Sequence, residues 1–292
     1  MTEDKNRWIA LGALVLGAGV TALAPIFVRL TETGPAAAAF WRLLFAMPIL
    51  AVLAARAEGA VGRPSRFGLA AGVTFALDLA FWHYGIHYTS VGLATVLSNL
   101  TPVVVTAVAW IFLKQPPQRL FLLALAIAIL GVAMMAGQRE GAPGINPPLG
   151  NLISTATSVW YALYMLAIAA GRRRESTSVL MFWSSLIGLP LVLVCALVLG
   201  EQITPAGAAG WFACAGLGLV HVAGQGSIAW AMGRLPAATA SLVVLVQPVL
   251  VAILGLVIFH EALTLWQIAG SAVALAGVVL AQRTSQPVKA PA

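Results

Sequence analysis

The sequence has very little of what a water-soluble enzyme needs. Charged residues make up only 9% of its 292 residues, and it contains two cysteines and four histidines. It has no Walker motif, no dinucleotide-binding glycine fingerprint and no cluster of metal ligands with compatible spacing. We therefore expect no cofactor, no bound metal and no enzymatic activity. Cys195 and Cys214 lie in apolar runs, which favours buried free thiols over a disulfide or redox pair.

What the sequence has in abundance is apolar residues, at 61% of the chain. A membrane-spanning helix needs about 20 of them in succession. We place ten such runs near residues 8–30, 36–56, 66–87, 90–113, 118–137, 149–170, 177–199, 207–231, 236–259 and 264–282. The runs are continuous rather than alternating, which excludes a membrane barrel. The sequence thus predicts an all-α integral membrane protein with ten transmembrane helices.

The first of these runs also resembles a secretory signal. Lys5 and Arg7 precede it, and Ala22-Leu23-Ala24 has the spacing of a cleavage site. Pro25 would directly follow the cut, where cleavage is disfavoured. Loss of the run would also leave the first half of the chain one helix short, so we interpret it as a membrane helix.

The sequence is internally duplicated, with an offset of about 142 residues that later becomes about 146. The matched pairs are Phe40-Trp41 with Phe182-Trp183, Pro48 with Pro190, Pro102 with Pro248, and Gly131-Val132 with Gly277-Val278. The identities are few, but the prolines match in an ungapped register. We predict two repeats of five helices, over residues 8–137 and 149–282.

Positive charge orients the predicted helices. With a cytoplasmic N-terminus, the cytoplasmic side receives Lys5, Arg7, Arg56, Arg63, Arg66, Lys114, Arg119, Arg172, Arg173, Arg174, Arg234, Arg283 and Lys289, and the other side only Arg29 and Arg139. The positive-inside rule then places both termini in the cytoplasm. We predict a multi-pass protein of a bacterial inner (plasma) membrane. The net charge of +7 is a topology signal that favours lipid as a partner and not nucleic acid.

An odd number of helices per repeat makes the second repeat enter the membrane from the opposite side. The two halves are therefore predicted to be inverted repeats. Inverted repeats are typical of secondary transporters, which bind substrate near the midplane between the repeats.

The end of the chain resembles the EamA repeat of the drug/metabolite transporter superfamily. The similar residues are His260-Glu261-Ala262-Leu263-Thr264-Leu265-Trp266-Gln267-Ile268-Ala269-Gly270 and Ala276-Gly277-Val278-Val279-Leu280, and Phe40-Trp41-Arg42 and Pro25-Ile26-Phe27-Val28-Arg29 resemble the start of the repeat. The resemblance spans about residues 8–282. It implies ten helices, a central cavity lined mainly by helices 1, 3, 4, 6, 8 and 9, and export of small metabolites. Within the superfamily, the chain resembles the YddG-type aromatic amino-acid exporters.

Polar residues within the predicted helices are candidates for the cavity, because ionisable groups are costly in a membrane. Asp78 is the one carboxylate deep inside a helix, and it is interpreted either as a proton- or amine-binding group or as a structural partner of Arg42. His83 follows on a neighbouring face. A metal site of His83 with His87 is not expected, since no third ligand has suitable spacing.

Further candidates come from the second repeat and from the prolines. His221 and Gln225 match Phe75 and Leu79 of the first repeat, so both faces could line one space. Thr157, Trp160 and Tyr164 share a helix face that would stack a flat substrate. Asn99 precedes Pro102, and Gln247 precedes Pro248. Because proline frees a carbonyl and bends a helix, we predict hinges at these two prolines.

These patterns predict a transporter that exports amino acids or related metabolites, aromatic ones included, by alternating access. Transport would be either uniport or proton-coupled, and a monomer would suffice. Two alternatives stay open. One is an intramembrane lipid-modifying enzyme that uses Asp78 and His83 as an acid–base pair, and the other is a lipid carrier with a laterally open, apolar cavity.

Overall fold

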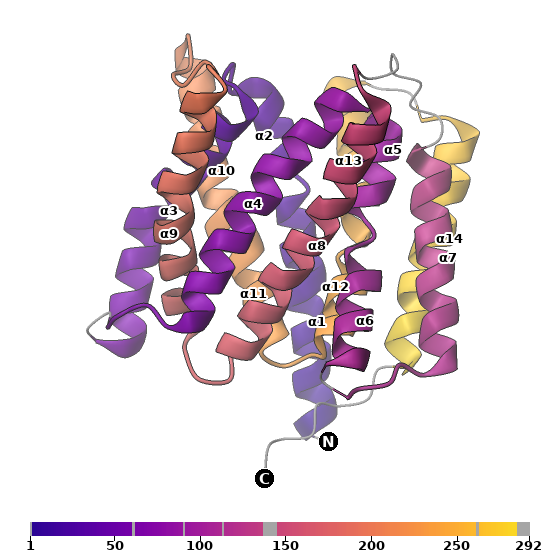
Figure 1. Ribbon diagram of the computed structural model, residues 1–292. Helices are drawn as coiled ribbons and strands as arrows, with labels where there is room; N and C mark the ends of the chain where they lie inside the picture. Colours follow the sequence, from indigo (N-terminus) through magenta and orange to yellow (C-terminus); the bar gives the residue numbers. More distant parts are fainter. Residues whose placement is uncertain are drawn as a thin grey trace.

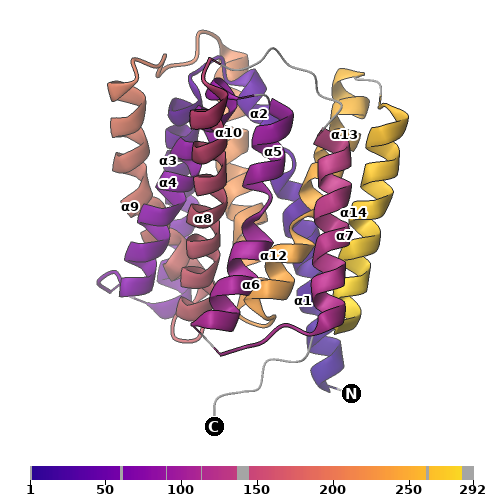
Figure 2. The same cartoon turned by 45° about the vertical axis from the view of Figure 1, so that its right-hand side comes forward.

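The computed structural model describes residues 2–59, 62–89, 91–112, 114–136, 145–260 and 263–284. Regular structure within these ranges is entirely helical, and the helices lie side by side in one bundle (Figures 1 and 2). This confirms the all-helical fold expected from the apolar runs.

The helices follow one another with short connections. The first half of the chain contains α1 (Thr2–Thr21), α2 (Ala24–Leu30), α3 (Pro35–Glu58), α4 (Arg66–Tyr88), α5 (Val91–Ser98), α6 (Thr101–Ile111) and α7 (Arg119–Ala136). The second half contains α8 (Pro147–Gly171), α9 (Thr177–Val198), α10 (Ala208–Val220), the π-helical turn η1 (His221–Gln225), α11 (Gly226–Met232), α12 (Ala237–Val243), α13 (Val246–Phe259) and α14 (Leu265–Thr284).

Nine helical stretches in the described residues are long and apolar enough to cross a membrane. They correspond to nine of the ten expected spans. The remaining one is α4, whose 23 residues extend about 34 Å at 1.5 Å per residue. It falls short in hydropathy because it carries Asp78 and two histidines. This polar helix packs between α8 and α9 inside the bundle.

The start of the chain meets its last helix. Arg7 donates a hydrogen bond from Nη2 to the carbonyl oxygen of Gln282, at 2.5 Å. We call the end of the bundle where α1 begins and α14 ends the terminal end, and the opposite end the far end. The terminal end lies at the bottom of Figure 1.

Four of the expected spans are interrupted in the described chain. The first span breaks at Ala22-Leu23, the fourth at Asn99-Leu100 and the ninth at Val244-Leu245, and the eighth contains η1. Turns of π-helix within α-helices often mark functional sites. The sequence predicted these segments as continuous helices, bent at most by proline.

A proline follows each of the three breaks, at Pro25, Pro102 and Pro248. Proline has no backbone N–H to bond the carbonyl one turn earlier. In the fourth span, that carbonyl belongs to Ser98, and it accepts a hydrogen bond from the Thr101 hydroxyl at 3.1 Å instead. At Leu100 and Leu245 the backbone keeps right-handed helical dihedral angles, so the interruptions before these two prolines are short turns within their spans. The role of the prolines as hinges stays a prediction.

Helices α7 and α14 pack closely through small residues. A Cβ atom on Gly131 would overlap the backbone of Ala274, and a Cβ atom on Gly277 would overlap the backbone of Ala128. The pairing is antiparallel, because a residue three positions earlier on α7 meets one three positions later on α14. It is also reciprocal, since Gly131 matches Gly277 and Ala128 matches Ala274 at the repeat offset.

A second reciprocal contact joins α4 to α9 and α10 to α3. A Cβ atom on Gly72 would lie 2.7 Å from the Cβ of Ile187, and one on Gly218 would lie 2.6 Å from the Cβ of Phe45. The two glycines match at the offset of about 146 residues, and Phe45 matches Ile187 at about 142. The first-half glycine thus meets a second-half residue, and the matching second-half glycine meets the matching first-half residue. Contacts of this kind characterise a two-fold axis.

Two carboxylates cap helices across the halves. The backbone N–H of Ala37 in α3 donates to Glu201 Oε2 at 2.9 Å. The backbone N–H of Ser176, just before α9, donates to Glu58 Oε1 at 2.8 Å. A negative charge stabilises a helix N-terminus. Each carboxylate lies near the C-terminal end of one of these two helices and caps the other, so α3 and α9 hold each other at both ends.

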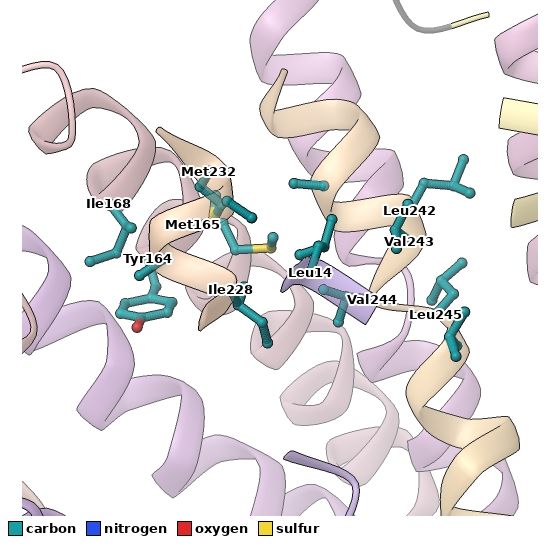
Figure 3. Packing of buried hydrophobic residues seen from close by; sticks show 14 of the residues in the cluster. Leu14, Tyr164, Met165, Ile168, Ile228, Met232, Leu242, Val243, Val244 and Leu245 are labelled. Carbon is teal, nitrogen blue, oxygen red and sulfur yellow. The ribbon is translucent and has the colours of Figure 1, made fainter. Parts of the chain in front are cut away.

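Buried apolar side chains fill the bundle toward the terminal end. Figure 3 shows part of this cluster: Leu14 of α1, Met165 and Ile168 of α8, Ile228 and Met232 of α11, Leu242 and Val243 of α12, and Val244 and Leu245 just after it. All of these side chains are buried. We call these nine residues the terminal plug.

Candidate functional site

A cavity of about 510 Å³ lies where the interrupted helices meet. Its wall includes residues at every break: Thr21 and Pro25, Asn99 and Pro102, Gln225, Leu245 and Pro248. The volume falls in the range of small-molecule sites, about 300–1,000 Å³. The breaks thus place backbone turns and polar side chains around one space inside the bundle.

The cavity extends toward the far end of the bundle. Its wall reaches Arg29 and Pro35 beside the turn after α2, Ala136 at the end of α7, and Gln267 at the start of α14. On the other side the cavity ends at the terminal plug, whose members Val244 and Leu245 form part of the wall. The space is therefore closed on that side by apolar packing.

The start of α14 is held by a capping box. The backbone N–H of Gln267 donates to Thr264 Oγ1 at 3.2 Å, and the backbone N–H of Thr264 donates to Gln267 Oε1 at 2.9 Å. Each of the two side chains thus accepts a hydrogen bond from the backbone of the other residue, which is the pattern of a capping box. It fixes Gln267 at the far-end margin of the cavity.

One acid and one base face the cavity from α4 and α3, in addition to Arg29 at its far-end margin. Asp78 lies in α4 and Arg42 in α3, and each is 9% exposed. They interact electrostatically, but they form no ion pair among the described residues. The Arg42 guanidinium lies over the ring of Phe75, 5.6 Å from its centroid, and its Nε has no hydrogen-bond partner. Both side chains are thus available to a ligand.

Two glutamine side chains also present polar atoms to the cavity. Gln225 Oε1 and Gln247 Nε2 are buried and have no hydrogen-bond partner. Asn99 and Thr157 line the wall too, but each donates to a backbone carbonyl of its own segment. A buried polar atom without a partner is costly. The two glutamines therefore offer one acceptor and one donor to whatever fills the space.

Aromatic rings form part of the cavity wall. Phe75, Tyr161 and Trp82 line it. Behind them, Tyr164 lies with its ring centroid 4.7 Å from that of Phe75, and it stacks on Tyr161 at 5.8 Å and 18°. This arrangement holds the Phe75 and Tyr161 rings in place. The wall thus offers flat apolar faces beside the two charges.

Comparison with known proteins now identifies the chain. The model of the EamA-like transporter family matches residues 8–137 and again residues 148–282. The chain belongs to the EamA-like transporter family. An "Uncharacterized transporter" of Archaeoglobus fulgidus is 27% identical to this EamA-like transporter over 272 residues, which cover 93% of the chain and 95% of that protein.

A solved crystal structure has the same fold. It superposes with a TM-score of 0.79 over 94% of this EamA-like transporter and 97% of the other chain, at 16% sequence identity. The family and the archaeal relative are both named as transporters, which is compatible with a protein that is not an enzyme. The protein is accordingly a multi-pass membrane transporter of small molecules.

Most residues that the sequence singled out lie on the cavity wall of this EamA-like transporter. They are Asp78, Leu79, Asn99, Thr157, Gln225 and Gln247, together with Pro102 and Pro248. They come from α4, α5–α6, α8, η1 and α13, which are far apart in the sequence. Their role in substrate binding stays a prediction.

Three candidates lie behind the wall instead. Trp160 packs edge-on against Phe81 of α4, with ring centroids 5.9 Å apart. The hydroxyl of Tyr164 donates to the sulfur of Met181 at 3.8 Å. His221 Nε2 lies 3.0 Å from Ser185 Oγ. Trp160 thus packs on α4, whereas Tyr164 and His221 bond to side chains of α9. The side chain of His83 lies outside the described residues.

The sequence analysis gave too little weight to three parts of the EamA-like transporter's cavity. Arg42 was considered only as a structural partner of Asp78, although it lines the cavity. Tyr161 was not singled out, although it is the tyrosine that lines the cavity. The break at Ala22-Leu23 was not expected, yet Pro25 is the same signal that marked the other breaks.

Proposed function

We propose that this transporter exports small amphipathic metabolites, amino acids with aromatic side chains among them, across the bacterial inner membrane. The observation that carries the proposal is the pair of buried opposite charges, Asp78 and Arg42, on the wall of one cavity. Ionisable side chains within a membrane usually serve a substrate or an ion path. A zwitterion supplies one charge of each sign and matches this pair.

The lining residues support a specific binding mode. The Arg42 guanidinium would bind the substrate carboxylate, and the Asp78 carboxylate would bind the ammonium group. Gln225 and Gln247 would take part in the remaining hydrogen bonds. Phe75, Tyr161 and Trp82 are the rings against which a flat side chain would stack. This mode satisfies the polar atoms that lack partners in the empty cavity.

The distribution of positive charge supports the orientation. In the described chain, Arg172 to Arg174 and Arg234 lie in the turns at the terminal end, whereas Arg29 lies toward the far end. We assign the terminal end to the cytoplasm by the positive-inside rule. Arg139 and Lys289, which also entered this assignment, lie outside the described residues.

The reciprocal contacts support two inverted repeats of five spans each. The antiparallel pairing of α7 with α14, and the exchanged roles of Gly72 with Ile187 and of Gly218 with Phe45, are what a two-fold axis in the membrane plane requires. In this arrangement the cavity faces the outside. The terminal plug closes the cytoplasmic side.

The inverted repeats also predict which residues close the cavity in the state that opens to the cytoplasm. If the halves exchange conformations, the matching residues of the other repeat must close the outside. Met165 and Ile168 of the terminal plug match Leu23 and Ile26, while Leu242 and Val243 match Val96 and Leu97. We propose that these four residues form the outer closure when the cavity opens to the cytoplasm.

We propose passive uniport as the energetic mode. Asp78 is the only acidic residue in the interior of a predicted span. A proton path would need further acidic groups leading to a surface. In the alternative, proton-coupled mode, Asp78 would carry the proton rather than bind the ammonium group.

Transport by the purified protein in proteoliposomes tests the proposal. A panel of radiolabelled amino acids should exchange across the membrane, and Asp78→Asn and Arg42→Gln should each reduce that exchange strongly. Glu175→Gln and Arg174→Gln, which remove one acid and one base from the turn after α8, are matched controls that should leave exchange unchanged. Movement of labelled lipid between leaflets, without amino-acid exchange, would favour a lipid carrier instead.

An imposed pH gradient separates the two energetic modes. Passive transport predicts that wild-type accumulation does not respond to it. A response that disappears in Asp78→Asn while exchange persists would establish proton coupling and would overturn the assignment of Asp78 to the ammonium group. A response that survives this substitution would mean that another residue carries the proton.

A further inference from the structure

A second hollow lies on the outer surface of the bundle near the terminal end. It has a volume of about 420 Å³ and shares no lining residue with the central cavity. Five elements form it: α1 with Ile9, α3 with Leu53, α9 with Thr177 and Ser178, η1 with Val222, and α11 with Trp230. Ile9 is 50% exposed and Leu53 is 37% exposed. We call this hollow the lateral groove.

The lateral groove is apolar along its length and polar at one end. Its polar end lies at the start of α9, where Thr177 Oγ1 is buried without a hydrogen-bond partner. Ser178 lines the groove next to it. A hydroxyl buried in this way is normally paired. The groove thus presents an unmatched polar atom beside an apolar channel.

Two arginines stand beside the polar end of the groove. The Arg234 guanidinium lies 3.6 Å from the centroid of the Trp230 ring, which lines the groove, and Arg234 Nη1 donates to the Trp230 carbonyl at 3.1 Å. Arg172 is half-buried, and its side chain packs against Gly233 on the same turn. Two cations are therefore held close together next to the membrane-facing surface.

Neighbouring negative charge compensates this arginine pair only in part. Burial and the neighbouring Arg234 lower the pKa of the Arg172 guanidinium, and Glu58 only partly opposes them. The Glu58 carboxylate is already bonded to the N–H of Ser176. Arg172 Nε has no hydrogen-bond partner in the described structure. Two like charges packed this way are stabilised by a bound anion.

We propose that the lateral groove binds an anionic phospholipid. One acyl chain lies in the apolar groove among α1, α3, α9 and α11, and the headgroup phosphate bonds Arg172 and Arg234. Guanidinium groups suit phosphate because their planar donors match its oxygens. The Thr177 hydroxyl is placed to donate to a lipid oxygen between the chain and the headgroup. This site is separate from the transport cavity and does not depend on the transported substrate.

The bound lipid would join four helices at the cytoplasmic end. Two belong to the first repeat and two to the second, and all of them lie near the terminal plug. The lipid therefore stabilises the arrangement in which that end is closed. Anionic lipids should raise the thermal stability of the purified protein in detergent, and zwitterionic lipids should not.

The test measures lipid binding directly. Purified protein in detergent is titrated with phosphatidylglycerol or with phosphatidylcholine of the same chains, and bound lipid is counted by native mass spectrometry alongside the melting temperature. The wild type should retain one phosphatidylglycerol preferentially. The double variant Arg172→Gln/Arg234→Gln should bind it about twenty-five-fold more weakly, since each basic residue near a membrane contributes about a fivefold factor.

Two further variants distinguish specific lipid binding in the lateral groove from non-specific attraction of anionic lipid to a basic surface. Arg119→Gln/Arg283→Gln removes the same charge from the terminal end at α7 and α14, away from the groove, and should bind phosphatidylglycerol like the wild type. Gly226→Leu fills the groove, because a Cβ atom there meets open space, and should block binding while both arginines remain. The proposal would be overturned if both double arginine variants lost phosphatidylglycerol binding equally. Unchanged phosphatidylglycerol binding in Gly226→Leu would also overturn it.

Discussion

At the scale of single residues, we propose that Asp78 and Arg42 select the charges that a substrate must carry. Both side chains are only 9% exposed. Even so, neither is neutralised by an ion pair in the described structure. A ligand that lacks one of the two charges leaves its partner unmatched. The two positions can therefore be tested separately, with substrates that differ by one charged group.

We expect Asp78→Asn to weaken the apparent affinity for amino acids by about tenfold to a hundredfold, the usual value of a hydrogen bond to a charged group. The affinity for a des-amino analogue such as 3-phenylpropionate should stay unchanged, because it has no ammonium group to lose. Concentration dependence of counterflow measures both. A similar loss for the two compounds would assign Asp78 a structural role.

The rings of the cavity wall lead to a second prediction. Tyr161→Leu should lower the affinity for phenylalanine and tryptophan by roughly twofold to tenfold, through lost aromatic contact, and leave alanine almost unaffected. Tyr164→Phe, which removes only a hydroxyl behind the wall, should change neither. Competition against a labelled substrate gives the ratios. A uniform effect across side chains would argue for altered packing.

The difference between Tyr161 and Trp160 marks the limit of prediction from sequence at this scale. Polar residues in apolar helices were recognised because they are costly in a membrane, and most of them line the cavity. Aromatic residues pack equally well against helices or cavities, so a stripe of rings does not say which face is empty. Only the contact of α8 with α4 assigns Trp160 to the packed side.

At the scale of helices, the breaks before the three prolines are the main feature. Restoring a continuous helix at Pro102 or Pro248 should slow the exchange of the two states. We expect Pro102→Ala and Pro248→Ala to reduce turnover about tenfold, which requires only about 1.4 kcal/mol of the roughly 3 kcal/mol that proline costs inside a helix.

Pro190→Ala is the matched control for these substitutions. Pro190 lies inside α9, which continues through it without a break. Its replacement should leave turnover near the wild-type value. Initial rates at saturating substrate measure the effect, and binding affinity should change little in all three variants. If Pro190→Ala slowed turnover to a comparable extent, the effect of removing a proline would come from a general stiffening of the helices and not from the two interrupted spans.

Much of the helix arrangement could be predicted because a membrane allows few alternatives. Apolar runs of about 20 residues fixed where nine spans lie, and proline marked two of the three breaks. The π-helical turn η1 could not be predicted, because nothing in His221 to Gln225 differs from a normal helix sequence. Its wider turn depends on packing, with Gly224 close to the backbone of Gly17 in α1.

At the scale of the whole molecule, the proposed orientation makes a direct prediction. Reporter fusions after residues 60, 118, 173, 234 and 285 should report the cytoplasm, and fusions after 33, 88, 143, 203 and 261 the opposite side. Paired alkaline phosphatase and fluorescent protein fusions measure both outcomes. A reversal confined to one half would contradict the inverted arrangement.

The proposed alternation predicts reciprocal labelling of matched residues. In a background without Cys195 and Cys214, Ile26→Cys should react with an impermeant reagent from outside, and Ile168→Cys only from inside. Conditions that raise one rate should lower the other, because closing one side opens the other. Rates that rise and fall together would favour local unfolding over alternating access.

The packing of α4 on α8, α7 on α14 and α3 on α9 has a consequence for biogenesis. All three contacts join the first half of the chain to the second. While the ribosome is still making the second half, the inserted first half has helix faces without partners. One of these helices is α4, which carries Asp78. We expect the first half to remain beside the insertion machinery until its counterpart arrives. Two separately expressed halves should each be degraded alone and accumulate only together.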